Sequence, residues 1–307
     1  MNQLSPDEPI RWFHRLEYAF LLFLRKLALT INPQKRNFFQ WCLYALAYHV
    51  IRICRSIVKT NLDLAFPNLS DEKKAQIGRD SYRWFSRLSF DALRLDLFAG
   101  KTQQLAQLEN LAVLDEALAE NKGVLLVSGH FGNWEVVAPV LAEKQYSTWM
   151  YVGQQSNPLV DEHHNQVRQK LNIQTIGKGK AAALQIGRVL NHKNILCMLV
   201  DQNDRKSSLF VDFFGRKASM SKGVASFYLM KRSPIVLVTC PYVGDKVLIK
   251  FERIYCDLTG NRERDTQLIA QAVTDRLEDV IREYPDQYFW MHRRWRTRPQ
   301  DDPVSLY

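Results

Sequence analysis

From Gly123 onward the chain alternates short, continuous apolar runs with stretches of helical character. The runs are VLLVS (124–128), STWMYV (147–152), IQTI (173–176) and ILCMLV (195–200), each bounded by turn residues. Strands without polar alternation are buried on both faces, and intervening helices are the connections that parallel strands need. The pattern therefore predicts an α/β fold with a mostly parallel, mixed sheet covered by helices.

Further elements surround this core. We expect helices over about 102–120, 219–231 and 264–284, and antiparallel strands over 234–243 and 246–254. The first hundred residues are predicted to be helical. We divide the chain into an amphipathic helical segment that associates with membranes, residues 1–60, and an α/β domain, residues 61–307.

Composition agrees with a folded, reduced protein. The chain has 307 residues, and 46% of them are hydrophobic, which excludes a disordered or collagen-like chain. The five cysteines are far apart and include no Cys-x-x-Cys pair, so we expect neither a disulfide framework nor a zinc site.

The net charge of +10 is concentrated in two places. Residues 1–60 contain nine Lys and Arg against three acidic residues, and residues 288–298 (YFWMHRRWRTR) contain four arginines and no acid. Together these two segments account for the whole excess. The protein is therefore locally basic, and its central region is electrically balanced.

Two apolar stretches near the N-terminus suggest contact with a membrane. They are YAFLLFL (18–24), which Arg25 and Lys26 end, and NFFQWCLYALAYHVI (37–51). A helix needs roughly 20 apolar residues to cross a bilayer, so we expect no standard transmembrane helix. We expect no secretory signal either, because acidic residues precede the first stretch and no small-residue cleavage site follows it.

The first of these helices is predicted to be amphipathic. On a helical wheel one arc holds the cations Arg11, Arg15, Arg25 and Lys26, and the opposite side holds Phe13, Leu16, Phe20, Leu24, Leu27 and Ile31. Such a helix can lie in the headgroup region of an anionic membrane. The alternative is an ordinary helix docked on the protein's own core, and a second basic, aromatic-rich helix over 36–59 keeps both interpretations open.

A candidate catalytic pair follows the strand VLLVS, in the segment Gly129-His130-Phe131-Gly132-Asn133-Trp134-Glu135. His130 lies on the loop after the carboxyl end of the strand, where open α/β sheets place their sites. We expect Glu135, in the first helical turn, to accept the Nδ1 proton, so that Nε2 is free to act as a general base. Gly129 and Gly132 are expected to leave room for a substrate. The spacing alone means little, because about 0.7 His-x4-[Asp/Glu] matches arise by chance in this composition. The strand-loop-helix context around His130 is what distinguishes this pair.

SGHFGNWE resembles the His-x4-[Asp/Glu] block of the bacterial lipid A late acyltransferases, the lauroyl/myristoyl acyltransferase family. Four more blocks agree in order and approximate spacing, namely NLDLAFPNLS (61–70), SNPLVDEHHNQVRQ (156–169), VDQNDRKSSLFVDFFGR (200–216) and DQYFWMHRRWRTRP (286–299). The resemblance thus spans roughly residues 60–300.

The resemblance implies transfer of a fatty acyl group from an acyl-carrier-protein thioester to a hydroxyl of a lipid A precursor. His130 matches the general base of the family and Glu135 its orienting acid. The chemistry agrees, because an alcohol attacks a thioester only when a base removes its proton. The resemblance also implies no metal or organic cofactor, and a place on the cytoplasmic face of the bacterial inner membrane.

The other blocks supply candidate substrate-binding residues: Arg168, Asp201, Gln202, Gly215 and Arg216. Arginine suits phosphate or carboxylate recognition, because its planar fork donates paired hydrogen bonds. The alternative for these charges is a structural ion pair, such as Asp201 with Arg216. The arginines of 292–298 are interpreted as a folded or membrane-facing edge, or as a solvated tail.

Three other functions compete with a lipid A acyltransferase. One is an acyltransferase that acts on another glycolipid. The second is a thioesterase with water as the acceptor, in which Ser128 is either a nucleophile or a plain buried strand serine. The third is a non-catalytic basic module that binds nucleic acid, although no nucleic-acid motif is found and the central region is not positively charged, so no nucleic acid is expected.

Overall fold

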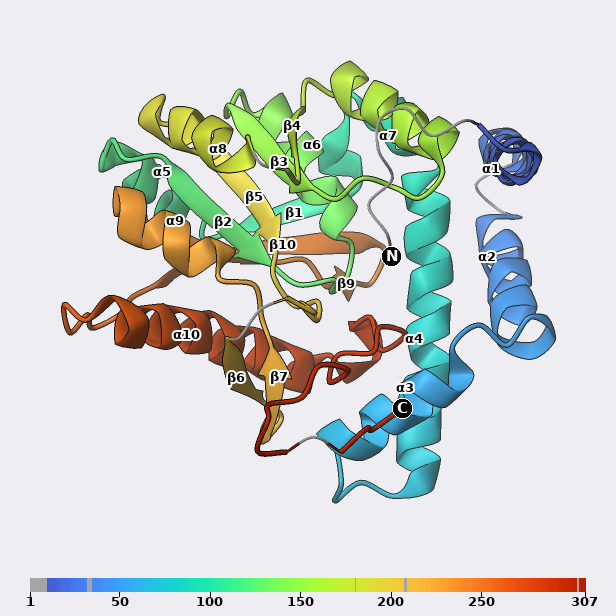
Figure 1. The fold of residues 1–307 in the computed structure, drawn as a ribbon. Helices are drawn as coiled ribbons and strands as arrows, with labels where there is room; N and C mark the ends of the chain where they lie inside the picture. Colours follow the sequence, from blue (N-terminus) through green and yellow to red (C-terminus); the bar gives the residue numbers. More distant parts are fainter. Residues whose placement is uncertain (1–9, 32–34, 180, 207–208, 303) are drawn as a thin grey trace.

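The computed structural model describes residues 10–31, 35–179, 181–206, 209–302 and 304–307, and its centre is an eight-stranded sheet (Figure 1). The strands are β1 (Ala106–Glu109), β2 (Val124–Ser128), β3 (Thr148–Val152), β4 (Gln174–Gly177), β5 (Ile195–Leu199), β8 (Ile235–Thr239), β9 (Tyr242–Val243) and β10 (Lys246–Ile254). Their order is β1-β10-β8-β2-β5-β3-β4, with β9 beside β10. Only the pairs of β10 with β8 and β9 are antiparallel, which confirms the mostly parallel sheet.

Helices cover both faces of the sheet. One face carries α5 (Ala112–Ala119), α6 (Val137–Glu143) and α7 (Pro158–Lys170), and the other carries α8 (Ala182–Asn191), α9 (Gly223–Lys231) and α10 (Arg262–Glu283). Successive side chains of β2 point to opposite faces of the sheet. Leu126 packs on the face that carries α5, α6 and α7, and Leu125 and Val127 pack on the face that carries α8, α9 and α10. The unbroken apolar run of β2 is thus explained by burial on both sides.

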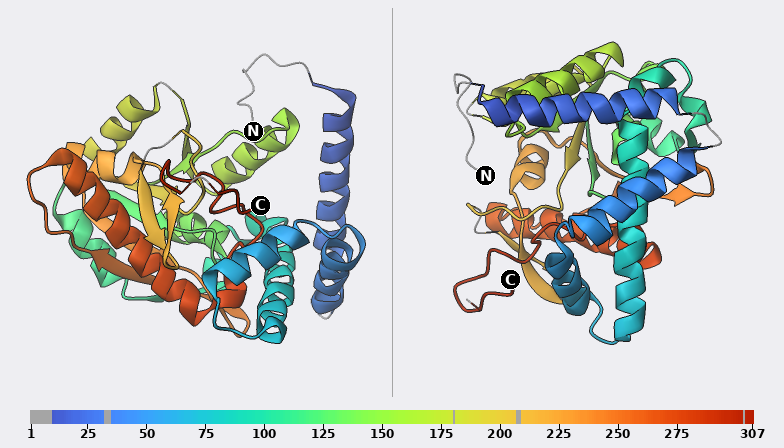
Figure 2. Two further views of the ribbon diagram at one scale, coloured as in Figure 1. Left: turned by 60° about the horizontal axis from the view of Figure 1, so that its bottom comes forward. Right: turned by 90° about the vertical axis from the view of Figure 1, so that its right-hand side faces the viewer.

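The N-terminal helices stand beside the α/β part (Figure 2). They are α1 (Trp12–Thr30), α2 (Arg36–Ala45), which continues as a π-helix (Leu46–Val50), α3 (Arg55–Ala65) and α4 (Asp71–Ala92). Helix α4 begins after Ser70, whose side chain accepts the backbone N–H of Lys73 at 3.3 Å. Within residues 10–31 and 35–100 the predicted helical character is confirmed, whereas residues 1–9 and 32–34 lie outside the described residues. The proposed boundary after residue 60 falls inside α3.

Two predicted elements differ from the structure. The region expected to be a helix over 102–120 contains β1, which adds to the sheet as an edge strand with Ala106 opposite Val247. Its helical parts are a 3₁₀ turn (Thr102–Gln104) and α5. A hairpin of β6 (Phe210–Phe213) and β7 (Arg216–Ser219) was not expected. Four-residue strands are too short for their periodicity to be recognised, so pairing partners decide their conformation.

One basic residue of α1, Arg25, faces the rest of the protein. Arg25 donates to Leu93 O at 2.7 Å and forms a 2.6 Å ion pair with Asp96. Arg25, one of the four cations of the basic arc, is thus used within the protein, because the pair with Asp96 ties α1 to the segment after α4. The outer side of α1 carries exposed Trp12, Leu16, Phe20 and Phe23.

No single helix in the described part of the chain is both long and apolar enough to cross a membrane. The segments Arg36–Val50 and Arg55–Ala65 meet the requirements of length and composition only when taken together, and they bend by 89° at their junction.

Candidate active site

His130 and Asp201 meet because the strands before them are neighbours. β2 and β5 pair in parallel, with Ser128 opposite Leu199. Each of the two site residues follows its strand by two positions, so both side chains reach the same edge of the sheet. This carboxyl edge is where open α/β sheets place their sites.

The side chains of His130 and Asp201 form a close, directed pair. Nδ1 of His130 lies 2.7 Å from Oδ1 of Asp201, and the backbone N–H of His130 donates to Oδ2 at 3.0 Å. Because Nδ1 faces a carboxylate, it carries the proton, and Nε2 keeps its lone pair. The imidazole is therefore held in the tautomer that can accept a proton from a substrate.

Burial and charge act in opposite directions on Asp201. The side chain is 3% exposed, and burial alone would raise the pKa of its carboxyl group. The hydrogen bonds from His130, the charge that His130 carries when it is protonated, and the charge of Arg294 together outweigh burial and hold this pKa at about 2. Asp201 is thus an ionised carboxylate at neutral pH.

The Nε2 atom of His130 faces outward. The His130 side chain is 18% exposed, and Nε2 of Gln202 lies 3.2 Å from Nε2 of His130, so the amide donates to the imidazole. Two rings fix the plane of the imidazole, with centroids 5.1 Å away for Trp134 and 6.1 Å for Phe289. A hydroxyl that takes the place of the Gln202 amide would reach the basic nitrogen directly.

Glu135 does not lie against Nδ1 of His130, contrary to the sequence-based expectation. Its Oε1 accepts a hydrogen bond from Nε1 of Trp134 at 3.0 Å. The chain enters a 3₁₀ turn at Trp134–Val136, in which successive side chains point about 120° apart. Trp134 therefore faces the imidazole, and Glu135 points into a pocket instead.

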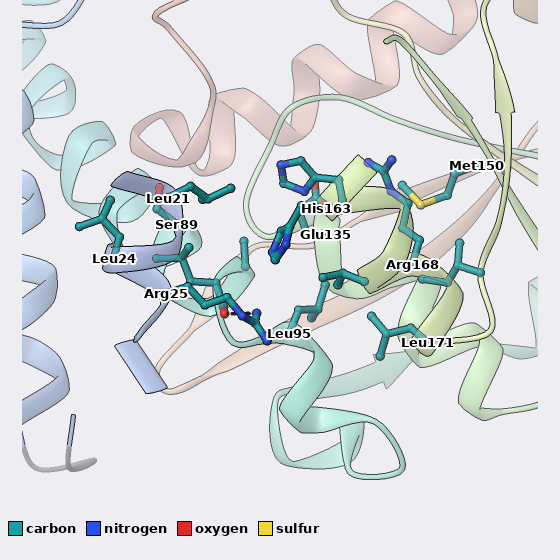
Figure 3. Close-up of a pocket in the computed structure, with 15 residues that line it drawn as sticks. Leu21, Leu24, Arg25, Ser89, Leu95, Glu135, Met150, His163, Arg168 and Leu171 are labelled. Atoms are coloured by element: carbon teal, nitrogen blue, oxygen red, sulfur yellow. Dashed lines mark hydrogen bonds between the residues drawn. The ribbon is translucent and has the colours of Figure 1, made fainter. Parts of the chain in front are cut away.

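This pocket lies under α1 and has a volume of about 320 Å³ (Figure 3). Its wall comes mainly from α1, α4 and α7, through apolar residues such as Leu24, Leu93 and Val167. Figure 3 shows Glu135 between Leu21 of α1 and Met150 of β3. Trp134 contacts the His130 ring and hydrogen-bonds Glu135, so a single aromatic side chain links the pocket to the dyad.

Arg168 lies in this pocket with Glu135. Its Nη1 donates to Asn165 at 3.3 Å, within α7. Burial lowers the pKa of the neighbouring imidazoles His163 and His164, and the charge of Arg168 lowers that of His164 further. At neutral pH these two imidazoles are therefore neutral, and the other polar residues that line the pocket are Glu135, Arg168, Arg25 and Ser89.

The two glycines beside His130 are needed for packing, which differs from the expected role of leaving room for a substrate. A Cβ atom on Gly132, where φ is +57°, would lie 2.0 Å from the carbonyl oxygen of Cys240. On Gly129 it would lie 2.9 Å from Cδ2 of Leu277. Both glycines therefore let the His130 loop approach β8 and α10 closely.

Gly215 and Arg216 lie at the turn of the β6–β7 hairpin. Neighbouring Phe214 donates its N–H to Glu278 of α10 and packs its ring against Phe66. Among the described residues Arg216 forms no ion pair, whereas Asp201 is bound to His130. The alternative ion pair of Asp201 with Arg216 is therefore wrong, and the structure gives Gly215 and Arg216 no contact with the dyad.

The C-terminal tail, residues 287–297, supports the dyad in a way that sequence reasoning missed. Phe289 donates its N–H to the backbone carbonyl of His130 at 3.0 Å. His292 Nε2 accepts the N–H of Asn203 at 2.9 Å, and burial lowers the pKa of His292 to about 4, so it stays a neutral acceptor. The interleaved aromatic and basic residues indicated a folded edge, but nothing in them indicated which loops they hold.

Ser128 is a structural residue. Its Oγ donates to the carbonyl of Val238 at 2.7 Å, and the residue is 4% exposed, so its hydroxyl does not face the site. Within the described ranges, no group of three or more His, Cys, Asp or Glu side chains is placed to hold a metal ion.

A solvent-facing Nε2 backed by an ionised carboxylate removes protons from hydroxyl groups or water. An apolar pocket one aromatic ring away suits a substrate with a hydrocarbon chain. Such a fold and site are typical of α/β enzymes that activate a hydroxyl group or water for attack on an acyl carbonyl.

Within this class, the chain belongs to the family described as bacterial lipid A biosynthesis acyltransferase, whose model matches residues 5–297. It is 24% identical over 273 residues to the lipid A biosynthesis palmitoleoyltransferase of Escherichia coli (strain K12), covering 86% of this chain and 85% of that protein. It is also 24% identical over 277 residues to the lipid A biosynthesis lauroyltransferase of the same organism, covering 84% of each. A phosphatidylinositol mannoside acyltransferase of Mycolicibacterium smegmatis is 24% identical over 203 residues, covering 63% of this chain and 65% of that protein.

The resemblance seen in the sequence is thereby confirmed. The protein is a lipid acyltransferase, and the groups that it transfers are not aminoacyl groups. Family membership excludes the non-catalytic alternative.

Proposed function

We propose that this protein transfers a fatty acyl chain from an acyl-carrier-protein thioester to a hydroxyl of a lipid A precursor, at the cytoplasmic face of the bacterial inner membrane. The observation that carries the mechanism is the unprotonated, partly exposed Nε2 of His130, which is held in that state by Asp201. Membership in the family supports the donor and the acceptor.

His130 acts as the general base in this proposal. Nε2 takes the proton of the acceptor hydroxyl while its oxygen forms a C–O bond with the thioester carbonyl carbon. The tetrahedral oxyanion then collapses, the C–S bond breaks, and the imidazolium returns the proton to the departing thiolate. Asp201 stabilises the imidazolium between these two transfers, so the protein ends the cycle in its starting protonation state.

The pocket under α1 accommodates the acyl chain in this proposal. Its apolar wall offers the environment that a hydrocarbon chain prefers over water, by about 0.8 kcal/mol for each buried CH₂ group. Trp134 connects the pocket to the imidazole, so a chain in the pocket can have its carbonyl carbon near Nε2 of His130.

Filling the pocket is expected to change the preferred donor. Ala92 lines the pocket from α4, and Ala92→Phe should lower the ratio of long-chain to short-chain transfer rates by at least about tenfold, because misfit by a methylene or more costs that much. Competition between two acyl-carrier-protein thioesters, read by mass spectrometry, measures this ratio. Leu97→Phe, at an exposed position nearby, is the control, and an unchanged ratio in Ala92→Phe would place the acyl chain elsewhere.

The outer faces of α1 and α2 support attachment to a membrane surface. Trp12 is 74% exposed and Phe38 is 67% exposed, and Val50, after α2, is 71% exposed. Exposed cations such as Arg15 and Arg52 lie on the same segments, and neither forms an ion pair in the described part of the chain. Large apolar side chains next to unpaired cations are typical of segments that lie in an anionic interface.

Charged substitutions on this face are expected to weaken membrane binding. The double variant Phe20→Asp, Phe23→Asp should reduce co-sedimentation with phosphatidylglycerol-containing vesicles by at least about tenfold, because each buried Phe contributes roughly 2 kcal/mol. Leu184→Asp, at an exposed position on α8, is the matched control. Equal binding of both variants would show that α1 does not lie in the interface.

The proposed reaction is tested by following one thioester with and without an acceptor. Mass spectrometry of a hydroxyacylated disaccharide lipid incubated with acyl-carrier-protein thioester should show a gain of one acyl chain. Release of free fatty acid with no heavier lipid would instead identify a thioesterase. A gain of mass only on a mannosylated phosphoinositide would identify another glycolipid as the acceptor.

A further inference from the structure

One side-chain amide occupies the working position of the proposed base. Nε2 of Gln202 lies 3.2 Å from Nε2 of His130, so the amide donates a hydrogen bond to the nitrogen that has to take the substrate proton. In the part of the chain that the structure describes, no other side chain forms a hydrogen bond with this nitrogen. The protein therefore covers its own general base with a residue of the loop that carries Asp201.

The backbone on both sides of Gln202 is anchored. Asp201, the residue before it, is 5% exposed and accepts hydrogen bonds from the dyad histidine at 2.7 and 3.0 Å. Asn203, the residue after it, donates its backbone N–H to Nε2 of His292 at 2.9 Å. The side-chain amide of Asn203 also donates to Oγ1 of Thr297 at 3.0 Å and accepts the Thr297 N–H at 2.8 Å. The loop is thus fixed on both sides, and the Gln202 amide remains within reach of the imidazole.

The cover over Nε2 can be displaced. Gln202 is exposed, so its side chain can turn into solvent without breaking the contacts that fix the loop. A water molecule that replaces the amide gains one hydrogen bond to Nε2 in exchange for the one that is lost. A lipid acceptor gains the same hydrogen bond and adds contacts along the rest of the molecule, and such remote binding energy offsets the displacement. The amide therefore discriminates against water and in favour of a bound acceptor.

Water at Nε2 would hydrolyse a bound thioester. Nε2 would take one proton of the water while the water oxygen forms a C–O bond with the thioester carbonyl carbon. The C–S bond would then break, and the imidazolium would return the proton to the departing thiolate. The products are a free fatty acid and a thiol, so each such event wastes one acyl donor. Excluding water from the reacting atoms is a general way to prevent this side reaction.

We propose that Gln202 is a specificity-determining residue, whose amide keeps water from Nε2 of His130 until the hydroxyl of a bound acceptor displaces it. The inference rests on the proposed function, in which His130 is the base for acyl transfer. Gln202 then decides between transfer and hydrolysis of the same thioester.

Hydrolysis of the acyl-carrier-protein thioester without an acceptor tests the proposal. Gln202→Ala should hydrolyse it about fivefold faster than the wild type, the factor that corresponds to one net hydrogen bond of about 1 kcal/mol. A gain in rate is informative, because a variant that merely disturbs the site would slow hydrolysis. Gln107→Ala, at an exposed position on β1, is the matched control and should match the wild type. Hydrolysis by Gln202→Ala at or below the wild-type rate would overturn the inference.

Two further comparisons assign the gain to its cause. The double variant His130→Ala, Gln202→Ala should lose the faster hydrolysis, and a gain that persists there would show that the water is not activated by His130. With a hydroxyacylated disaccharide lipid present, the ratio of free fatty acid to acylated lipid should be higher in Gln202→Ala than in the wild type. No acylated lipid from the wild type would overturn the proposed function, whereas wild-type transfer with an unchanged ratio in Gln202→Ala would overturn this inference alone.

Chemical modification provides a test that needs no substrate. Diethyl pyrocarbonate reacts with accessible, unprotonated imidazole nitrogens, and peptide mass spectrometry follows each histidine separately. His130 should be modified about fivefold faster in Gln202→Ala than in the wild type, because the competing hydrogen bond is gone. The exposed His192 is the internal reference and should react equally in both proteins. Equal modification of His130 in the two proteins would show that the amide does not cover Nε2.

Discussion

Replacing His130 by alanine is expected to lower kcat/KM for acyl transfer by about 10²–10⁴-fold, the range that a general base contributes. Nε2 of the imidazole is unprotonated and partly exposed to solvent, and alanine has no side-chain atom that could accept the hydroxyl proton at that position. Single-turnover transfer from a labelled thioester measures the loss.

The matched control is His192→Ala. His192 is exposed after α8, before the strand β5 begins, so it lies at the end of that strand opposite to the site. This variant should keep nearly the full rate. Full transfer by His130→Ala, with an unchanged melting temperature, would exclude His130 as the base.

Asp201→Asn is expected to slow acyl transfer by a factor similar to that of His130→Ala. The carboxylate accepts both the Nδ1–H and the backbone N–H of His130. The amide of asparagine has a single oxygen, so one of these donors would face an NH₂ group, and the imidazole would turn or change tautomer. The tautomer change is costly in catalysis, and a loss of about 10²–10⁴-fold in kcat is expected.

The control for Asp201→Asn is Asp204→Asn, on the same loop. Its Oδ1 accepts the nearby N–H of Lys206 at 2.9 Å, a bond that asparagine can keep. Transfer by Asp204→Asn should stay within about twofold of the wild type, as expected for a surface change. Equal rates in the wild type and Asp201→Asn would contradict the assigned role of Asp201.

The pH dependence of stability gives Asp201 a second signature. The pKa of its carboxyl group is lowered from 3.8 to about 2 in the folded protein, so the ionised carboxylate stabilises the fold above the unfolded pKa. This contribution, on the order of 2 kcal/mol, is lost as the pH falls from about 4 to about 2. The difference in stability between the wild type and Asp201→Asn should therefore shrink over that range.

The core of the fold was predictable because its signals are local. Runs such as VLLVS are buried on both faces, and the carboxyl ends of parallel strands share one edge, which places His130 correctly. β1 and the β6–β7 hairpin were not predictable, because four-residue strands gain their conformation from partners distant in the sequence, such as Val247 for Ala106.

The partner of His130 could have been found from the same logic. Asp201 follows β5 by two positions, which is the same offset as that of His130 from β2. The His-x4-Glu spacing predicted Glu135 as the partner instead. The 3₁₀ turn at Trp134–Val136, which only the structure shows, directs this side chain away from His130. The role of the tail could not be foreseen, since its contacts join His292 to a loop 89 residues away and Phe289 to a loop still more distant in the sequence.

The most direct measurement is the Nδ1 proton of His130 itself. In protein labelled with ¹⁵N-histidine, a proton shared with a carboxylate gives a downfield NMR signal, which His130→Ala assigns by its absence. We predict that this signal persists in Glu135→Gln and disappears or shifts upfield in Asp201→Asn. Persistence in Asp201→Asn together with loss in Glu135→Gln would contradict the dyad and return the orienting role to Glu135.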